Sequence, residues 1–245
     1  VLGVYTQADK WSKMSSASVS QILTATFVPL LSGVQDDAQT FRRYLKRVNR
    51  FTAFLLFPVM FGLTIIGAPL FHTLFGNKWD AAIPIFQILT LRGIFIVMIS
   101  LYNNFILSIG AARKLFIVEI IKDVLIFVAI LSTMWSGNLT LIVWGQFAAS
   151  ALTWMIVLRI ASRATGYSAG SLLYDLLPSL GISLLMGVLA VIPLLLSIHP
   201  ALKLIMMIAV GAVSYIALSR IFRIPEVSDV SSFLLRKLNK DRNRS

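Results

Sequence analysis

The amino-acid sequence predicts an all-α integral membrane protein with about seven transmembrane helices. The chain of 245 residues is 58% hydrophobic, and its mean hydropathy is +0.85. Only 13% of its residues are charged, whereas about a quarter are charged in a typical soluble domain. Uncharged runs extend over residues 51–77, 124–158 and 176–202. Each run is long enough to cross the hydrocarbon core of a bilayer, which takes about 20 residues of helix.

Seven segments of suitable length follow one another along the chain. We expect helices at residues 5–33, 49–73, 81–108, 114–135, 138–162, 173–197 and 202–222. Turn signals separate most of them: Gly76-Asn77, Gly110, Ser136-Gly137-Asn138, Gly166 and His199-Pro200. Pro58 and Pro69 fit within a membrane helix, because neighbouring helices and waters can satisfy the freed backbone groups.

The connections between these segments are alternately basic and non-basic. The basic residues of the first, third and fifth connections and of the tail are Arg42, Arg43, Lys46, Arg47, Arg50, Arg113, Lys114, Arg159, Arg163, Arg220, Arg223, Arg236, Lys237, Lys240, Arg242 and Arg244. The other connections contain only Lys78, balanced by Asp80, and Lys203. Since Lys and Arg gather in cytoplasmic connections, we expect a cytoplasmic C-terminus and an external N-terminal end. This distribution accounts for the net charge of +12 without a nucleic-acid partner, which needs a basic stripe on a soluble surface.

The expected division is a transmembrane bundle over residues 1–225 and a basic cytoplasmic tail over residues 226–245. In the tail, Val230, Phe233, Leu234 and Leu238 recur at helical spacing. The tail is therefore either a short amphipathic helix on the inner leaflet or a solvated basic segment. The chain starts with Val1 and shows no signal peptide, and we interpret it as part of a longer protein.

The first expected helix is unusually polar on one face. The residues that share this face are Lys10, Lys13, Ala17, Gln21 and Thr24. A face of this kind cannot point at lipid, so it must face protein or a water-filled cavity. The alternative is an i,i+4 pair between Asp9 and Lys13 near the outer interface.

The third expected helix contains Arg92, Ser100 and Asn103 on one face. A charge at the depth of Arg92 costs about 2.5–3.5 kcal/mol on insertion scales, so an intramembrane arginine is a functional candidate by default. The alternative is a structural role, in which Arg92 pairs with an acidic residue on another helix.

The fourth expected helix carries Glu119, Lys122 and Asp123 on one face. Lys122 lies near the cytoplasmic end, where it could instead extend its ammonium group to the interface. In the fifth helix, Gln146, Ser150 and Thr153 form a stripe that is typical of helix packing.

The sequence lacks the residue sets of common enzymes. Cysteine is absent, and the only two histidines, His72 and His199, lie far apart. No Ser/His/Asp or Cys/His set, no carboxylate cluster in an outer loop and no Gly-rich phosphate loop is found. We therefore expect no catalysis, no cofactor and no metal site. The intramembrane cations Lys10, Lys13, Arg92 and Lys122 indicate instead a transporter or lipid translocase for an anionic headgroup.

Several motifs carry a family resemblance. They are Tyr5-Thr-Gln-Ala-Asp-Lys-Trp-Ser-Lys13, Phe27-Val-Pro-Leu-Leu-Ser-Gly-Val-Gln-Asp-Asp37, Phe75-Gly-Asn-Lys-Trp79 with Ala82, Pro84, Gln87 and Leu89, and Glu119-Ile-Ile-Lys122. In order and spacing they resemble the bacterial polysaccharide (O-antigen) flippases of the multidrug/oligosaccharidyl-lipid/polysaccharide exporter superfamily. The matches cover roughly residues 1–125, and Arg92 has no counterpart in the general family pattern.

The resemblance implies a specific fold and function. Such proteins have about fourteen helices in two lobes, and this chain would form part of the C-terminal lobe, with the N-terminal lobe missing. It implies export of undecaprenyl-diphosphate-linked oligosaccharide repeats through the bacterial inner membrane, for O-antigen, capsule or exopolysaccharide. Contacts with substrate are expected from Lys10, Lys13 and Gln21 of the first helix, and from Arg92, Asn103, Glu119 and Lys122.

Three alternatives stay open. A drug or small-solute exporter of the same superfamily would need an ion-coupling acid, for which Asp9 and Glu119 are the reasonable choices. An integral glycan polymerase or ligase would need a large outer loop, which this stretch does not contain. A non-catalytic scaffold subunit would tolerate replacement of every intramembrane charge.

Overall fold

The computed structural model describes residues 2–32, 38–196 and 198–226, and this part of the chain is helical without a strand. The elements are α1 (Leu2–Ser32), α2 (Ala38–Phe75), η1 (Asn77–Ala82), α3 (Ile83–Ser108), α4 (Ala112–Met134), α5 (Leu139–Thr165), α6 (Ala169–Tyr174), α7 (Leu177–Val191), η2 (Ile192–Leu195) and α8 (Pro200–Ile221). Residues 33–37, which end one of the quoted motifs, and residues 227–245 of the expected basic tail lie outside the described residues.

The all-α membrane fold is confirmed, and the seven expected helices correspond to α1, α2, α3, α4, α5, the α6–α7–η2 segment and α8. Five described segments are long and apolar enough to cross a membrane: Gln39–Phe75, Asn77–Ser108, Leu139–Thr165, Ala169–Leu195 and Pro200–Ile221. Helix α4 is not among them, since every 18-residue stretch of it contains Glu119, Lys122 and Asp123. These three charges need a polar environment, as their position on one helical face suggested.

The turns form where the sequence predicted them. Gly76, Gly110, Gly137 and Gly166 all have φ between +63° and +74°, a region that glycine enters without steric cost. The first basic connection differs from the expectation. Helix α2 begins at Ala38 rather than at residue 49, so most of this connection extends the helix beyond its apolar part.

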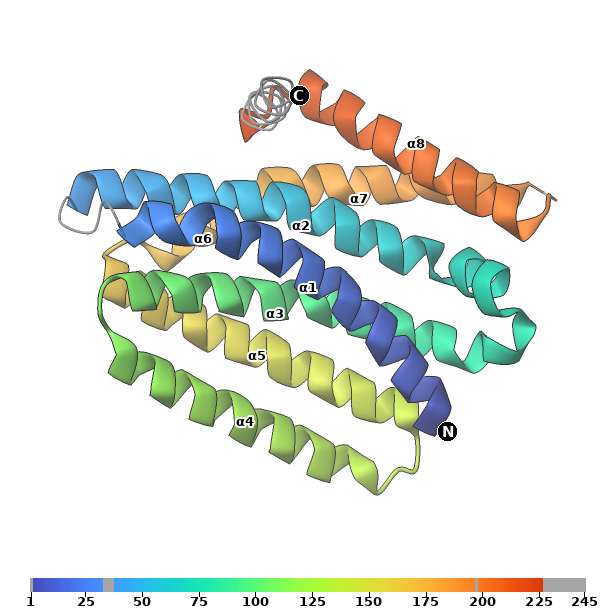
Figure 1. The fold of residues 1–245 in the computed structure, drawn as a ribbon, viewed down its shortest axis with the longest axis horizontal. Coiled ribbons are helices and arrows are strands. Elements are labelled where there is room, and N and C mark those ends of the chain that lie inside the picture. The colour runs from blue at the N-terminus through green and yellow to red at the C-terminus, as the bar shows by residue number, and fades with distance from the viewer. Residues whose placement is uncertain (1, 33–37, 197, 227–245) are drawn as a thin grey trace, which may run out of the picture.

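The helices form two groups that meet at α2 and α3 (Figure 1). Helix α3 packs between α1 and α5, and α4 packs on α5. Helices α7 and α8 pack against each other and against α2, which also contacts α3. Large buried side chains from α2 and α3, including Leu56, Met60, Tyr102 and Phe105, fill the core between the groups.

Basic and non-basic connections lie at opposite ends of the bundle. Figure 1 shows the start of α2, the α3–α4 turn and the α5–α6 turn at one end, which we call the basic end. The N-terminus, η1, the α4–α5 turn and the start of α8 lie at the other end. The alternation of charge along the sequence thus corresponds to two ends of different charge.

Buried polar contacts join α2 to its neighbours at the basic end. Asn49 is fully buried. Its Nδ2 donates to the carbonyl oxygen of Leu172 at 2.9 Å, and its Oδ1 accepts from the Tyr102 hydroxyl at 3.2 Å.

A further hydrogen bond joins the two sides of the short helix α6. The Tyr167 hydroxyl donates to Asp175 at 2.8 Å. Burial, together with this hydrogen bond, raises the pKa of Tyr167 to about 12, so the hydroxyl stays a donor well into the alkaline range.

A proline in α2 explains a contact with α8. Pro58 has no N–H group, so the carbonyl of Phe54, one turn earlier, loses its helical partner. The hydroxyl of Tyr215 on α8 donates to this carbonyl at 2.7 Å. A side chain of a neighbouring helix thus satisfies the freed group, as the membrane setting requires.

We predict that Tyr215→Phe lowers the free energy of unfolding by about 1–3 kcal/mol, because the Phe54 carbonyl is left buried without a donor. Unfolding of the detergent-solubilised protein measures this value. Tyr174→Phe is the matched control, since Tyr174 is 72% exposed and should change stability by less than about 0.5 kcal/mol. Equal stability of both variants and the wild type would contradict this role of Tyr215.

Candidate functional site

A polar cavity of about 280 Å³ lies between α3, α4 and α5. Its lining consists of Arg92, Ser100, Asn103, Asn104, Glu119, Lys122 and Ser150, with Ile96, Ile99 and Ile126. Four of the seven residues expected from the sequence therefore meet at one site: Arg92, Asn103, Glu119 and Lys122. Helical spacing brings Arg92 and Asn103 to one face of α3, and it brings Glu119 and Lys122 to one face of α4. The packing of α4 on α5 closes the space between these two faces.

Arg92 is held by neutral partners on α5. Its Nε donates to Ser150 Oγ and its Nη1 donates to Gln146 Oε1, both at 2.9 Å. No carboxylate forms an ion pair with Arg92 among the described residues; Asp9 of α1 interacts with it electrostatically. Asp9 is thus an acidic residue on another helix that acts on Arg92, as the structural alternative expected, but the two form no ion pair in this part of the chain. The guanidinium keeps its positive charge, and further N–H groups remain to bind an anion.

The Gln146–Ser150 stripe has a role that the sequence did not reveal. It was interpreted as a packing surface, and Thr153 fits this interpretation, since it is buried and donates to the Ala149 carbonyl at 2.8 Å. Gln146 and Ser150 instead orient Arg92. The signal was a polar stripe opposite an intramembrane arginine, but the sequence could not show that α3 and α5 are neighbours.

The acidic side of the cavity is a local cluster on α4. Lys122 forms an ion pair with Glu119 one turn away, and Asp123 lies 3.8 Å from the Lys122 ammonium group. Asn103 Nδ2 donates to Glu119 Oε1 at 3.4 Å. The cavity lining thus contains two cations and one carboxylate among the described residues, so its net charge is positive.

The α1 residues lie apart from this cavity. Lys10, Lys13 and Gln21 are all exposed on α1 and do not line the cavity. Lys13 pairs with Asp9 at 2.6 Å, which is the i,i+4 pair that the sequence offered as the alternative. The structure therefore separates the predicted site residues into the cavity group and an exposed polar face of α1.

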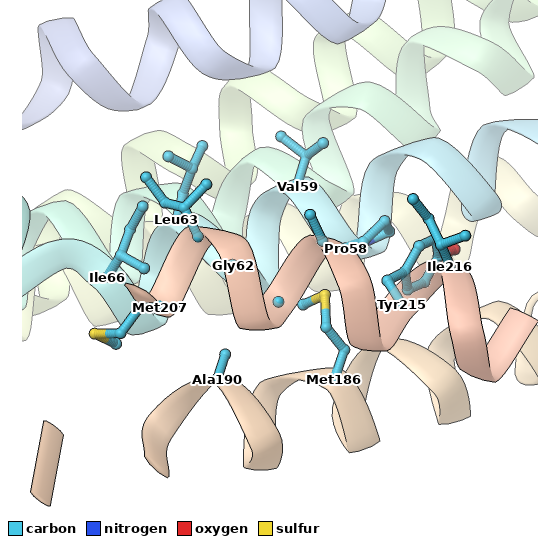
Figure 2. A pocket seen from close by; sticks show the side chains of 13 residues that line it. Pro58, Val59, Gly62, Leu63, Ile66, Met186, Ala190, Met207, Tyr215 and Ile216 are labelled. Carbon is cyan, nitrogen blue, oxygen red and sulfur yellow. The ribbon is translucent and has the colours of Figure 1, made fainter. Parts of the chain in front are cut away.

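An apolar groove of about 490 Å³ lies on the other side of the bundle, between α2, α7 and α8. Figure 2 shows side chains from all three helices around it, among them Pro58, Met186, Met207 and Tyr215. Gly62 leaves space in the α2 wall. The chain thus has a polar cavity in one group of helices and an apolar groove in the other.

Comparison with known proteins finds relatives whose names concern the biosynthesis or transport of polysaccharides. Residues 1–84 match a protein family described as "Polysaccharide biosynthesis protein". The teichuronic acid biosynthesis protein TuaB of Bacillus subtilis is 22% identical over 221 residues, which are 89% of this chain and 46% of TuaB. The succinoglycan biosynthesis transport protein ExoT of Rhizobium meliloti is 24% identical over 166 residues, 68% of this chain and 32% of ExoT.

A solved structure has the same fold. The lipid II flippase MurJ, in an inward closed conformation, aligns with a TM-score of 0.69 and 16% identity, over 89% of this chain and 47% of MurJ. The chain thus spans less than half the length of the proteins that it matches. These proteins are described as a biosynthesis protein, a transport protein and a flippase. The resemblance inferred from the motifs is confirmed, and the part-length match agrees with the expected partial lobe.

If the polar cavity holds water, a cysteine at position 103 should react with a membrane-impermeant anionic methanethiosulfonate. We predict that Asn103→Cys, in a background without other cysteines, reacts roughly tenfold faster or more than Phe105→Cys, because only an accessible thiolate is a nucleophile. Phe105 is the matched control, with 1% exposure in the core. Mass spectrometry of the labelled protein measures both rates, and equal rates at normal membrane levels would contradict a hydrated cavity.

Proposed function

We propose that the chain is part of a flippase for undecaprenyl-diphosphate-linked oligosaccharide repeats. Its similarity to polysaccharide biosynthesis and transport proteins, and its fold, shared with a lipid II flippase, support this proposal. The flippase would move these repeats across the bacterial inner membrane for O-antigen, capsule or exopolysaccharide synthesis. It acts without covalent chemistry.

The observation that supports this proposal is the Arg92 guanidinium in the polar cavity, which forms no ion pair with the residues that the structure describes. Arginine binds phosphate oxygens through paired N–H donors, and its planar guanidinium is oriented here by Gln146 and Ser150. An anion gains more from such a charge in a partly desolvated cavity than in water. In the proposed mechanism, Arg92 and Lys122 attract the diphosphate or acidic sugars, and Asn103 and Asn104 offer hydrogen bonds to sugar hydroxyls.

The remaining predicted residues have a place in this mechanism. Lys10, Lys13 and Gln21 of α1 face outward from the described bundle, where the missing N-terminal lobe would complete the path. Rocking of the two lobes would open this path to each side in turn. The polyprenyl tail stays in the lipid, which removes the cost of moving a long hydrocarbon through a polar cavity.

The proposed orientation places the basic end in the cytoplasm. The rule that Lys and Arg accumulate in cytoplasmic connections supports it, as does their gathering at one end of the bundle. The C-terminal end of α8 then faces the cytoplasm, and the flippase would load the lipid-linked repeat from that side.

We predict that Arg92→Gln and Lys10→Ala each lower export of the polysaccharide roughly tenfold or more, because a charge-assisted contact is worth about 1.5–3 kcal/mol. Arg92→Lys keeps the charge and should retain part of the activity. Lys78→Gln is the control, since Lys78 is an exposed cation of η1 that does not line the polar cavity. Surface polysaccharide is measured against the amount of protein in the membrane.

Unchanged surface polysaccharide in both Arg92→Gln and Lys10→Ala, at normal membrane levels, would remove these residues from the mechanism. Loss of dye efflux that depends on an ion gradient, with intact polysaccharide, would instead favour the small-solute exporter.

A further inference from the structure

A separate groove lies at the basic end, between α7 and the residues that follow α8. Its volume is about 720 Å³. It is lined by Arg50 of α2, by Leu177, Pro178, Gly181, Ile182, Leu184, Leu185 and Val188 of α7, and by Phe222, Arg223, Ile224 and Pro225. We call it the α7 groove. It shares no residue with the polar cavity or with the apolar groove of Figure 2.

The α7 groove is apolar along its length and cationic at one end. Its α7 wall runs from Leu177 to Val188, which at 1.5 Å per residue spans roughly 16 Å. This is about half the thickness of a hydrocarbon core, the depth of a single leaflet. The two charged lining residues are Arg50 and Arg223, and no acidic residue belongs to the described lining.

Arg223 occupies an unusual backbone position. It follows α8 with φ +49°, and the next N–H, of Ile224, donates to the Ser219 carbonyl at 3.0 Å. This is the helix-ending motif in which glycine usually takes the left-handed position. The chain places an arginine there instead, and a non-glycine residue in a sparsely populated conformation points to a use for its side chain.

The two arginines differ in their pairing. Arg50 Nε lies 2.6 Å from Glu226 Oε1, and its Nη2 donates to Glu226 Oε2 at 3.4 Å, so its charge is largely balanced. Arg223 forms no ion pair within the described residues and is exposed. Within the described residues, the groove therefore has a guanidinium without an ion pair beside an apolar channel that is about one leaflet deep.

We propose that the α7 groove binds an anionic phospholipid of the leaflet at the basic end. Arg223 binds the phosphate, and an acyl chain lies along Leu184, Leu185 and Val188. Basic pockets between membrane helices are known to bind anionic headgroups in this way. Such a lipid links the end of α8 to α7 and α2, and it is distinct from the transported substrate.

The test counts lipid bound to the protein, purified at its natural length, by native mass spectrometry. The probes are palmitoyl-oleoyl-phosphatidylglycerol and, as the neutral reference, palmitoyl-oleoyl-phosphatidylcholine. Arg223→Gly removes the guanidinium and keeps the left-handed backbone, so the helix end stays intact. Gly181→Phe fills the groove, because a Cβ at Gly181 meets nothing within 4 Å. Val213→Phe on α8 is the control, since Val213 is 69% exposed and lines neither groove.

The expected result is retention of phosphatidylglycerol over phosphatidylcholine by the wild type and by Val213→Phe. Arg223→Gly and Gly181→Phe should each lose roughly tenfold of the bound phosphatidylglycerol, as expected for loss of about 1.4 kcal/mol. Equal retention of the two lipids by the wild type, or unchanged retention in both variants, overturns the proposal.

Two further outcomes also overturn it by assigning the groove to another occupant. A lipid preference that emerges only after deletion of residues 227–245 assigns the groove to that segment of the chain. Displacement of phosphatidylglycerol by undecaprenyl diphosphate, with the same dependence on Arg223, assigns it to the transported lipid.

Discussion

The free-energy cost of placing a charged or unpaired polar group in hydrocarbon governs where the polar residues of this chain lie. A lone charge at the bilayer centre costs about 2.5–3.5 kcal/mol on insertion scales. Arg92 meets this constraint through Gln146 and Ser150, and Glu119 meets it through Lys122 and Asn103. Backbone groups obey the same constraint, since Tyr215 supplies the donor that Pro58 cannot.

The constraint also divides the bundle into two halves with different chemistry. The helices α3, α4 and α5 gather the intramembrane charges around a cavity, whereas α2, α7 and α8 enclose apolar grooves. A lipid-linked sugar has the same division, with a charged, hydrated head and a long hydrocarbon tail. The proposed path for the head alone would need a polar cavity with an apolar surface beside it, and the described bundle contains one polar cavity of this kind and apolar grooves.

Local patterns made much of this predictable. Helical spacing predicted that Arg92 and Asn103 share a face of one helix, and that Glu119 and Lys122 share a face of the next. Glycines marked the turns that the structure contains. Contacts between helices were not predictable in this way. Arg92 and its partners on α5 are 54 and 58 residues apart in sequence, and spacing within one helix does not show which neighbour it meets. The same reason explains why the polar face of α1 was grouped with the cavity, although Lys10, Lys13 and Gln21 lie elsewhere on the surface.

The most direct test of the flippase account is made on the intact gene. The gene is deleted, and lipid-linked glycans are extracted and assigned to a leaflet by their accessibility from outside. The account predicts that complete repeat units on undecaprenyl diphosphate accumulate on the inner leaflet, and that the wild-type gene restores their movement outward. A glycan pool unchanged in amount and leaflet would contradict it, and complete single units on the outer leaflet that fail to polymerise would show a polymerase instead.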